Sequence, residues 1–212
     1  MPAFLFIFIL LPVLLFLFIS LLFLPFRFAI YSLLNIFTIP VLLVKIVINP
    51  KLRANHALEH ATINVMEENF GCLNLSGQGE ENGFVIQGAV DPHHLINAAR
   101  VGLSRLKNGE KNLAIHRRCG TSILAANLLS SILIVYLLWS IGYFGFFYIL
   151  LALFVAQLFG PALGVLLQKF VTTSTRVDNY EIVGIEGATI FSGGFVTPAG
   201  QRYFIRTRQY GN

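Results

Sequence analysis

The chain has 212 residues, of which 56% are hydrophobic and only 12% are charged, and its mean hydropathy is +0.73. Because a soluble domain carries about 25% charged residues, this composition indicates an integral membrane protein that lies in a lipid bilayer. The net charge of +5 is spread over polar segments, which favours contact with anionic lipid headgroups. No basic-aromatic recognition motif is present, so we expect no nucleic-acid partner.

Three long stretches contain no charged residue: 3–25, 28–44 and 122–167. A spanning helix needs about 20 residues, so the third stretch is long enough for two helices, and the tetrad Gly-Tyr-Phe-Gly at 142–145 divides it. The first block lacks a basic start and a small-residue cleavage site, which favours a retained helix over a cleaved leader. The sequence thus predicts about four transmembrane helices, at 3–25, 28–49, 122–141 and 145–168.

The four helices form two pairs that separate two polar segments. The predicted domains are a transmembrane pair at 1–49, a polar segment at 50–121, a second pair at 122–168 and a tail at 169–212. Lys and Arg concentrate in the two polar segments, whereas the opposite side would hold only Arg27 and an uncharged turn. By the positive-inside rule, both polar segments and both chain termini are expected in the cytoplasm.

The polar segments carry short elements of their own. Hydrophobic periodicity predicts helices at 54–69 and 92–107, the second capped by Asp91. Residues 74–83 are rich in Gly, Asn and Ser and predict a turn region before a short strand at 84–87. The tail predicts two strands, 181–191 and 195–206, joined at Gly193-Gly194. The expected fold is therefore mainly α, with a small α+β cytoplasmic portion built from segment 50–121 and the tail.

The segment His56-Ala57-Leu58-Glu59-His60 has the pattern H-x-x-E-H, the inverse of the commoner zinc motif H-E-x-x-H. On a helix, His56 and His60 lie one turn apart and face the same way, so both can bind one metal ion. Glu59 lies on their flank and is the candidate general base. Glu67, almost in line with the two histidines, is a further candidate ligand, and Asn64 could orient an imidazole. The alternative is an ordinary solvated helix face.

A second polar cluster, residues 115–122, stands at the mouth of the third predicted transmembrane helix. His116 or Cys119 could complete a three-ligand site and leave a fourth position for water or substrate. Arg117 and Arg118 could hold an anionic group, but anchoring at the membrane surface is the favoured explanation for both.

Two other polar groups have simpler interpretations. The first, at the end of the fourth predicted helix, is typical of helix termination and capping; it comprises Gln168, Thr172, Thr173 and Asp178. The second, the pair His93-His94, is predicted to be a solvated first helical turn.

Together the three clusters resemble a bacterial family of uncharacterised membrane proteins, often labelled predicted metal-dependent enzymes of unknown function. The shared order is H-x-x-E-H-x-T-I-N-x-x-E, then H-x-R-C-G-T-S opening an apolar helix, then L-Q-x-x-x-T-T with an acidic residue soon after. The resemblance covers about residues 50–185 and implies a bacterial plasma membrane location. It also implies six positions of interest: His56, Glu59, His60, Glu67, His116 and Cys119.

The favoured function is a membrane-embedded metal-dependent hydrolase with its site at the cytoplasmic membrane surface. A divalent ion, most readily Zn²⁺, would be held by His56, His60 and either His116 or Glu67, with Cys119 as a further candidate. A site at the bilayer surface favours a lipid-linked or membrane-protein substrate. Two alternatives stay open: a non-catalytic membrane protein with a structural metal site, and a histidine-box iron oxygenase, although such enzymes use more histidines than the five present here.

Overall fold

The computed structural model describes residues 2–71, 74–142, 145–191 and 200–211. The chain divides into two compact units. Unit 1 comprises Met1–Ile39 and Ala126–Gly160, and unit 2 comprises Pro40–Ala125 and Pro161–Asn212. Each unit is therefore described separately.

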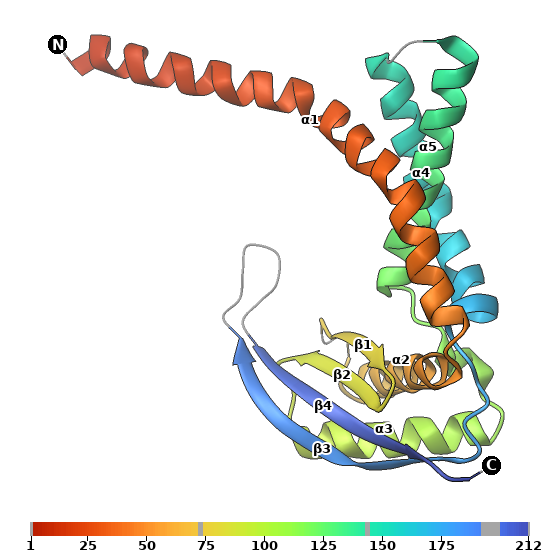
Figure 1. The fold of residues 1–212 in the computed structure, drawn as a ribbon. Helices are drawn as coiled ribbons and strands as arrows, with labels where there is room; N and C mark the ends of the chain where they lie inside the picture. The colour runs from red at the N-terminus through yellow and green to blue at the C-terminus, as the bar shows by residue number, and fades with distance from the viewer. Residues whose placement is uncertain (1, 72–73, 143–144, 192–199, 212) are drawn as a thin grey trace. The chain divides into compact units, whose positions relative to one another are not determined.

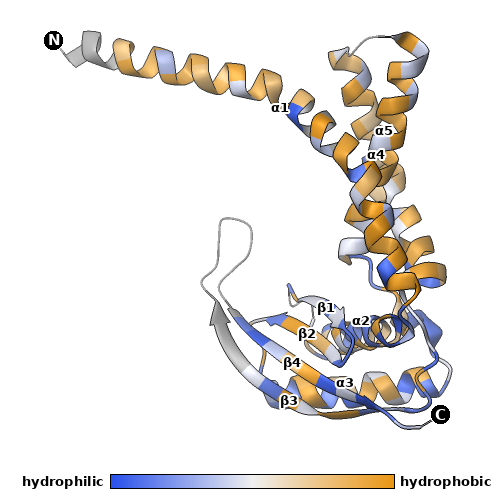
Figure 2. Ribbon diagram, viewed as in Figure 1, coloured by the Kyte–Doolittle hydropathy of each residue, from blue (hydrophilic) through white to orange (hydrophobic). Residues whose placement is uncertain are grey.

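Unit 1 is built from parts of three apolar helices, α1 (Pro2–Val47), α4 (Gly120–Ile141) and α5 (Phe146–Leu167). All three helices are predominantly hydrophobic, as Figure 2 shows. Helices α4 and α5 approach closely, because a Cβ added to Gly160 would lie 2.4 Å from the Cβ of Ala126. Among the described residues, three helices are long and apolar enough to cross a membrane, or up to four if the bent pair Leu33–Val47 and Pro50–Phe70 counts as one span.

The two helices predicted at 3–25 and 28–49 are one continuous helix, α1, in the structure. The prediction placed a break at the lone charge of Arg27. A chain reversal normally requires a cluster of turn-forming residues such as Gly, Asn, Asp or Pro, and next to Arg27 the sequence offers only Pro25, with Phe26 and Phe28 on either side. The helix therefore continues through Arg27.

Unit 2 contains a four-stranded antiparallel sheet with two helices on one face (Figure 1). The strands are β1 (Ser76–Glu80), β2 (Gly83–Gly88), β3 (Tyr180–Phe191) and β4 (Gly200–Gln209), in the order β1-β2-β4-β3. Helices α2 (Pro50–Phe70) and α3 (Pro92–Lys107) pack on each other and on the sheet. Apolar side chains from both layers form the core, including Leu58, Phe84, Ile86, Leu95, Tyr203 and Ile205. Two short turns complete the unit: the 3₁₀ turn η1 (Lys111–Ala114) and the π-helical turn η2 (Gln168–Thr172).

Several predicted elements of unit 2 are confirmed. Helix α3 has the predicted bounds, and the side chain of Asp91 accepts hydrogen bonds from the backbone N–H groups of His93 and His94. Strand β2 covers the predicted strand at 84–87, and β3 and β4 pair antiparallel. The proposed turn at Gly193-Gly194 and the first five residues of the predicted strand 195–206 lie outside the described residues.

Two predictions for unit 2 are corrected. Helix α2 begins at Pro50 rather than at 54, because Asn49 caps it by accepting a hydrogen bond from the backbone N–H of Leu52. Residues 76–80, predicted as part of a turn region, form strand β1. Its glycines are required by close packing against α2, not by a turn, and composition alone does not separate these two causes.

Candidate metal centre

Helix α2 brings His56, Glu59 and His60 together on the face that it buries in unit 2. Glu59 is 3% exposed and His60 is fully buried. The ring centroids of the two imidazoles are 4.4 Å apart. Their shared direction is the one that helical spacing predicts, but these residues lie inside the unit rather than on a solvated helix face.

Each of these imidazoles is held by a backbone carbonyl. Nδ1 of His56 lies 3.0 Å from the carbonyl oxygen of Thr172, and Nδ1 of His60 lies 2.8 Å from that of Ala114. Because a carbonyl only accepts, both Nδ1 atoms must carry the proton, and both Nε2 atoms keep their lone pairs. Burial lowers the pKa of both histidines, and for His60 the charges of His56 and His116 add to this effect. Neutral imidazoles with a free Nε2 are the form that binds metal.

Cys119 supplies a third ligand atom. Its Sγ lies 3.4 Å from Nε2 of His56, and the ligand atoms of His56, His60 and Cys119 all lie within 4.8 Å of one another. Tetrahedral Zn²⁺ with bonds of about 2.0–2.3 Å places its ligand atoms roughly 3.3–3.8 Å apart. The three residues therefore fit a metal ion with little rearrangement. Burial raises the pKa of the Cys119 thiol, so its thiolate form requires a nearby cation.

The carboxylate of Glu59 adjoins this group. Its Oε2 lies 3.6 Å from Nε2 of His56 and 3.8 Å from Nε2 of His60. Oε2 of Glu59 and Nε2 of His60 are both buried without a hydrogen-bond partner. Buried polar atoms without partners are rare, and they mark positions that are able to bind an ion, a water or a ligand. Burial also raises the pKa of Glu59 to about 8.

The other two candidate ligands, His116 and Glu67, lie outside the three-residue group. The ring of His116 has its centroid 6.1 Å from that of His60, and its Nε2 lies 3.5 Å from Oε2 of Glu67. Glu67 also accepts a hydrogen bond of 2.6 Å from Arg118. His116 and Glu67 are thus partners of each other at the border of the site.

The sequence suggested that Asn64 orients an imidazole directly, but its amide group bonds to the backbone instead. Its amide group donates to the carbonyls of Leu113 and Ile115, each at 3.0 Å. These carbonyls flank Ala114, whose own carbonyl holds His60. Asn64 therefore orients the imidazole of His60 indirectly, through the backbone of η1.

The end of α5 belongs to the site, although the sequence suggested only helix termination there. The carbonyl of Thr172 in η2 holds His56. The side-chain oxygen of Gln168 accepts a hydrogen bond of 2.8 Å from the backbone N–H of His116. The one signal in the sequence was the L-Q-x-x-x-T-T motif, which carries no recognisable ligand type. Asp178 is exposed and contributes nothing to this arrangement.

Two glycines of β1 lie directly on the motif helix. A Cβ at Gly77 would be 2.4 Å from Oε1 of Glu59, and a Cβ at Gly79 would be 2.9 Å from the backbone nitrogen of His56. At Gly79 the neighbour is helix backbone, so a side chain there would push β1 away from α2, whereas at Gly77 a side chain would displace the carboxylate of Glu59 or the strand. Sequence reasoning missed these residues because their composition also suits a turn.

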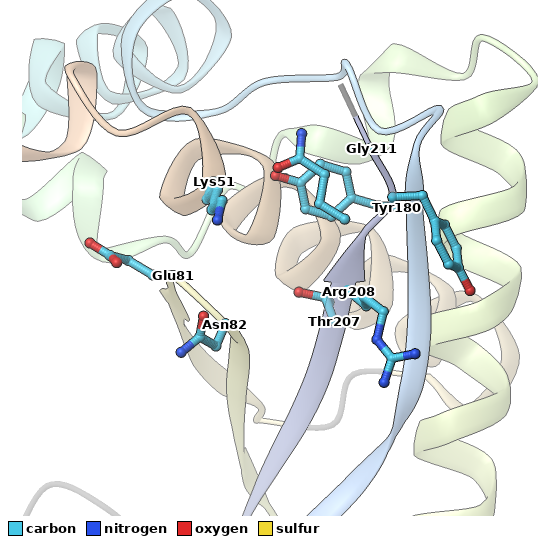
Figure 3. Close-up of a pocket in the computed structure, with 9 residues that line it drawn as sticks. Lys51, Glu81, Asn82, Tyr180, Thr207, Arg208 and Gly211 are labelled. Atoms are coloured by element: carbon cyan, nitrogen blue, oxygen red, sulfur yellow. The ribbon is translucent and has the colours of Figure 1, made fainter.

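A pocket of about 490 Å³ opens beside the metal ligands. Its wall includes His56 and Cys119, the backbone of β1 and the apolar side chains Leu42, Ile46 and Leu124. A separate pocket of about 380 Å³, drawn in Figure 3, is lined by Lys51, Tyr180 and Arg208 among others. That second pocket contains none of the candidate site residues.

A family model described as "Domain of unknown function (DUF6391)" matches residues 51–185. The chain belongs to this family. An uncharacterised protein of Picosynechococcus sp. (strain ATCC 27264 / PCC 7002 / PR-6) is 39% identical over 89 residues, which are 38% of this chain and 43% of that protein. The chain thus covers less than half the length of this relative. No solved structure matches the chain. The resemblance to an uncharacterised family is confirmed, and neither description names an activity or a ligand.

Proposed function

We propose that this member of the family is a membrane-embedded metal-dependent hydrolase whose site lies at the cytoplasmic membrane surface. The observation that carries the proposal is the grouping of two α2 histidines with Cys119, beside the carboxylate of Glu59. Three ligand atoms lie within 4.8 Å of one another, and a buried carboxylate oxygen without a partner lies 3.6 and 3.8 Å from two of them.

Two imidazoles and one thiolate suit Zn²⁺, which is the ion we expect. Three protein ligands leave a fourth position open, as catalytic zinc sites do. A bound divalent ion would polarise the substrate and make the attacking water more acidic. Glu59 would take a proton from that water and pass it to the leaving group. The same cation would lower the pKa of Glu59 and so make its carboxylate available as a base.

The neighbourhood of the site supports a substrate at the membrane surface. Cys119 immediately precedes α4, which is apolar enough to cross a membrane. A lipid-linked molecule or a membrane protein is therefore the substrate class that could reach the site from the bilayer.

One observation favours a second candidate, a structural metal site. Because Oε2 of Glu59 is close to both Nε2 atoms, this carboxylate could be a fourth ligand and close the coordination shell. The iron oxygenase alternative gains nothing comparable, since His93 and His94 lie exposed at the start of α3, as predicted for a solvated turn.

Metal content separates these candidates. Protein purified in mild detergent without a metal-affinity tag should contain about one Zn²⁺ per chain, and His56→Ala and His60→Ala should lose it. His93→Ala, an exposed histidine outside the site, is the matched control and should keep it. Glu59→Gln should retain the metal while failing to complement a deletion phenotype, because it lacks the base. If Glu59→Gln loses the metal as completely as the histidine variants, Glu59 is a ligand and the hydrolase proposal fails.

A further inference from the structure

The pocket beside the metal ligands is bordered by the open edge of the sheet. Strand β1 is first in the order β1-β2-β4-β3, and within the described residues it pairs only with β2. A two-residue turn joins the strands, so Glu80 and Gly83 form the first hydrogen-bonded pair. In an antiparallel ladder, alternate residues direct their N–H and C=O groups away from the partner strand. On β1 these are Gly77 and Gly79.

No backbone group elsewhere in the described part of the chain bonds to Gly77 or Gly79. Exposed strand edges of this kind tend to pair with another strand. The same two glycines lie against Glu59 and His56 of α2. A strand added to β1 would run about 4.8 Å from the β1 backbone, and it would therefore lie close to these two residues.

We propose that β1 binds an extended polypeptide as an added strand and presents one of its peptide bonds to Glu59 and the metal ligands. The inference rests on the proposed function and names its substrate class. The pocket is lined by residues of β1, by His56 and Cys119, and by the apolar side chains Leu42, Ile46 and Leu124. A bound segment would therefore meet hydrogen-bonding groups, two of the candidate metal ligands and an apolar surface for one side chain. Glu59 lies against the β1 backbone at Gly77.

The alternative occupant, a lipid acyl chain, fits the chemistry of this pocket less well. An acyl chain cannot hydrogen-bond, so it would cover the N–H and C=O groups of Gly77 and Gly79 without satisfying them, which is costly. An extended peptide satisfies them with its own amides, as in other cases of strand addition.

The reaction on this substrate is amide hydrolysis, with water as the co-reactant. The water oxygen forms a bond to the carbonyl carbon, and the bond from that carbon to nitrogen breaks. Glu59 accepts the proton from the water and delivers it to the leaving nitrogen. The products are a carboxylic acid and an amine, which exchange a proton to become a carboxylate and an ammonium group, and no oxidant or reductant is needed.

The test measures binding to the full chain in detergent micelles, with Glu59→Gln to prevent turnover and with Zn²⁺ added. The probe is a pool of fluorescein-labelled decapeptides of randomised Leu, Val, Phe, Thr and Ser. Two twin pools carry N-methylated amides at odd or at even positions, which removes the donors used in strand pairing. We expect the unmodified pool to bind and the methylated twins to bind about tenfold more weakly, in at least one register. Leu124→Trp should fill the pocket and abolish binding, whereas Ile123→Trp, 64% exposed and outside the pocket, should not.

The results separate the two proposals, because Zn²⁺ content is measured on the same samples. Equal binding of all three pools overturns strand addition, and so does binding of a fluorescent phospholipid without binding of any peptide. If Zn²⁺ binds and no pool does, the inference fails while the metal site stands. If peptides bind with the expected loss on methylation but no metal is held, β1 is a peptide site and the hydrolase proposal fails.

Discussion

Individual atoms in the site differ in whether they already have a partner. Nδ1 of His56 and of His60 are bonded to carbonyls, whereas Nε2 of His60 and Oε2 of Glu59 are not. The sequence could place these side chains on one helical face, because their spacing alone decides that. The sequence could not decide whether His116 or Cys119 is the third candidate ligand. In the structure, Gln168 bonds to the backbone of His116, and the ring of His116 lies beside Glu67 rather than in the three-residue group.

The buried carboxyl group of Glu59 predicts a pH dependence of stability in metal-free protein. Its ordinary pKa of 4.5 is raised to about 8 by burial, so the native chain keeps a proton that the unfolded chain has lost between these values. Rising pH therefore favours the unfolded chain, and this contribution to stability disappears as pH passes about 8. Glu59→Gln cannot titrate.

The measurement is the Tm of both proteins in detergent with a chelator, at pH 5 and at pH 8. The two histidines titrate in both proteins, so their effect cancels in the comparison. We expect the Tm of the native sequence, relative to that of Glu59→Gln, to fall between pH 5 and pH 8. Parallel Tm curves would show that Glu59 is ionised in the fold.

Among the secondary-structure elements, β1 connects the fold to the site most directly. Gly77→Ala places a Cβ 2.4 Å from Oε1 of Glu59, so either the carboxylate or the strand must move. We expect activity to fall by at least tenfold, with a lower Tm and with metal content preserved, because neither histidine is touched. Gly184→Ala is the matched control, since a Cβ there meets nothing within 4 Å. A Gly77→Ala protein with the activity and Tm of the control would mean that β1 does not fix the position of Glu59.

The accuracy of the predicted elements depended on local signals. Helix α3 was predictable to the residue, since Asp91-Pro92 marks its start and its apolar face is regular. Strand β1 was not predictable, because its glycines reflect close contact with α2. That contact is between residues far apart in the chain, and the local sequence carries no signal for it. The role of η2 was hidden for a similar reason: it acts through a backbone carbonyl, which every residue has.

At the scale of the whole molecule, the lengths of the apolar helices decide how the chain would lie in a bilayer. Helix α1 has 46 residues and would be about 69 Å long at 1.5 Å per residue, more than twice the hydrocarbon thickness of about 30 Å. Composition correctly predicted the apolar segments, but it could not predict that the first two would join. If a continuous α1 crosses the membrane once, Arg27 reaches the far side and both polar segments stay inside, but the N-terminus also lies on the far side. The expectation of a cytoplasmic N-terminus therefore requires the two separate helices that the structure replaces with one.

Thiol labelling of intact cells tests this topology. With an impermeant reagent, Arg27→Cys should be labelled from outside. Lys111→Cys and Arg208→Cys, both at exposed positions of unit 2, should be labelled only after permeabilisation. The parent chain with its own two cysteines gives the baseline. Labelling of Lys111→Cys and Arg208→Cys from opposite sides would refute the topology.

The most direct test of the metal centre is X-ray absorption at the zinc edge on untagged protein. We expect a shell of nitrogen or oxygen neighbours at about 2.0–2.1 Å and one sulfur at about 2.3 Å. Cys119→Ser should remove the sulfur contribution, whereas His93→Ala should leave the spectrum unchanged. Protein without bound metal, or a metal without a sulfur neighbour in the native sequence, would contradict a site built from His56, His60 and Cys119.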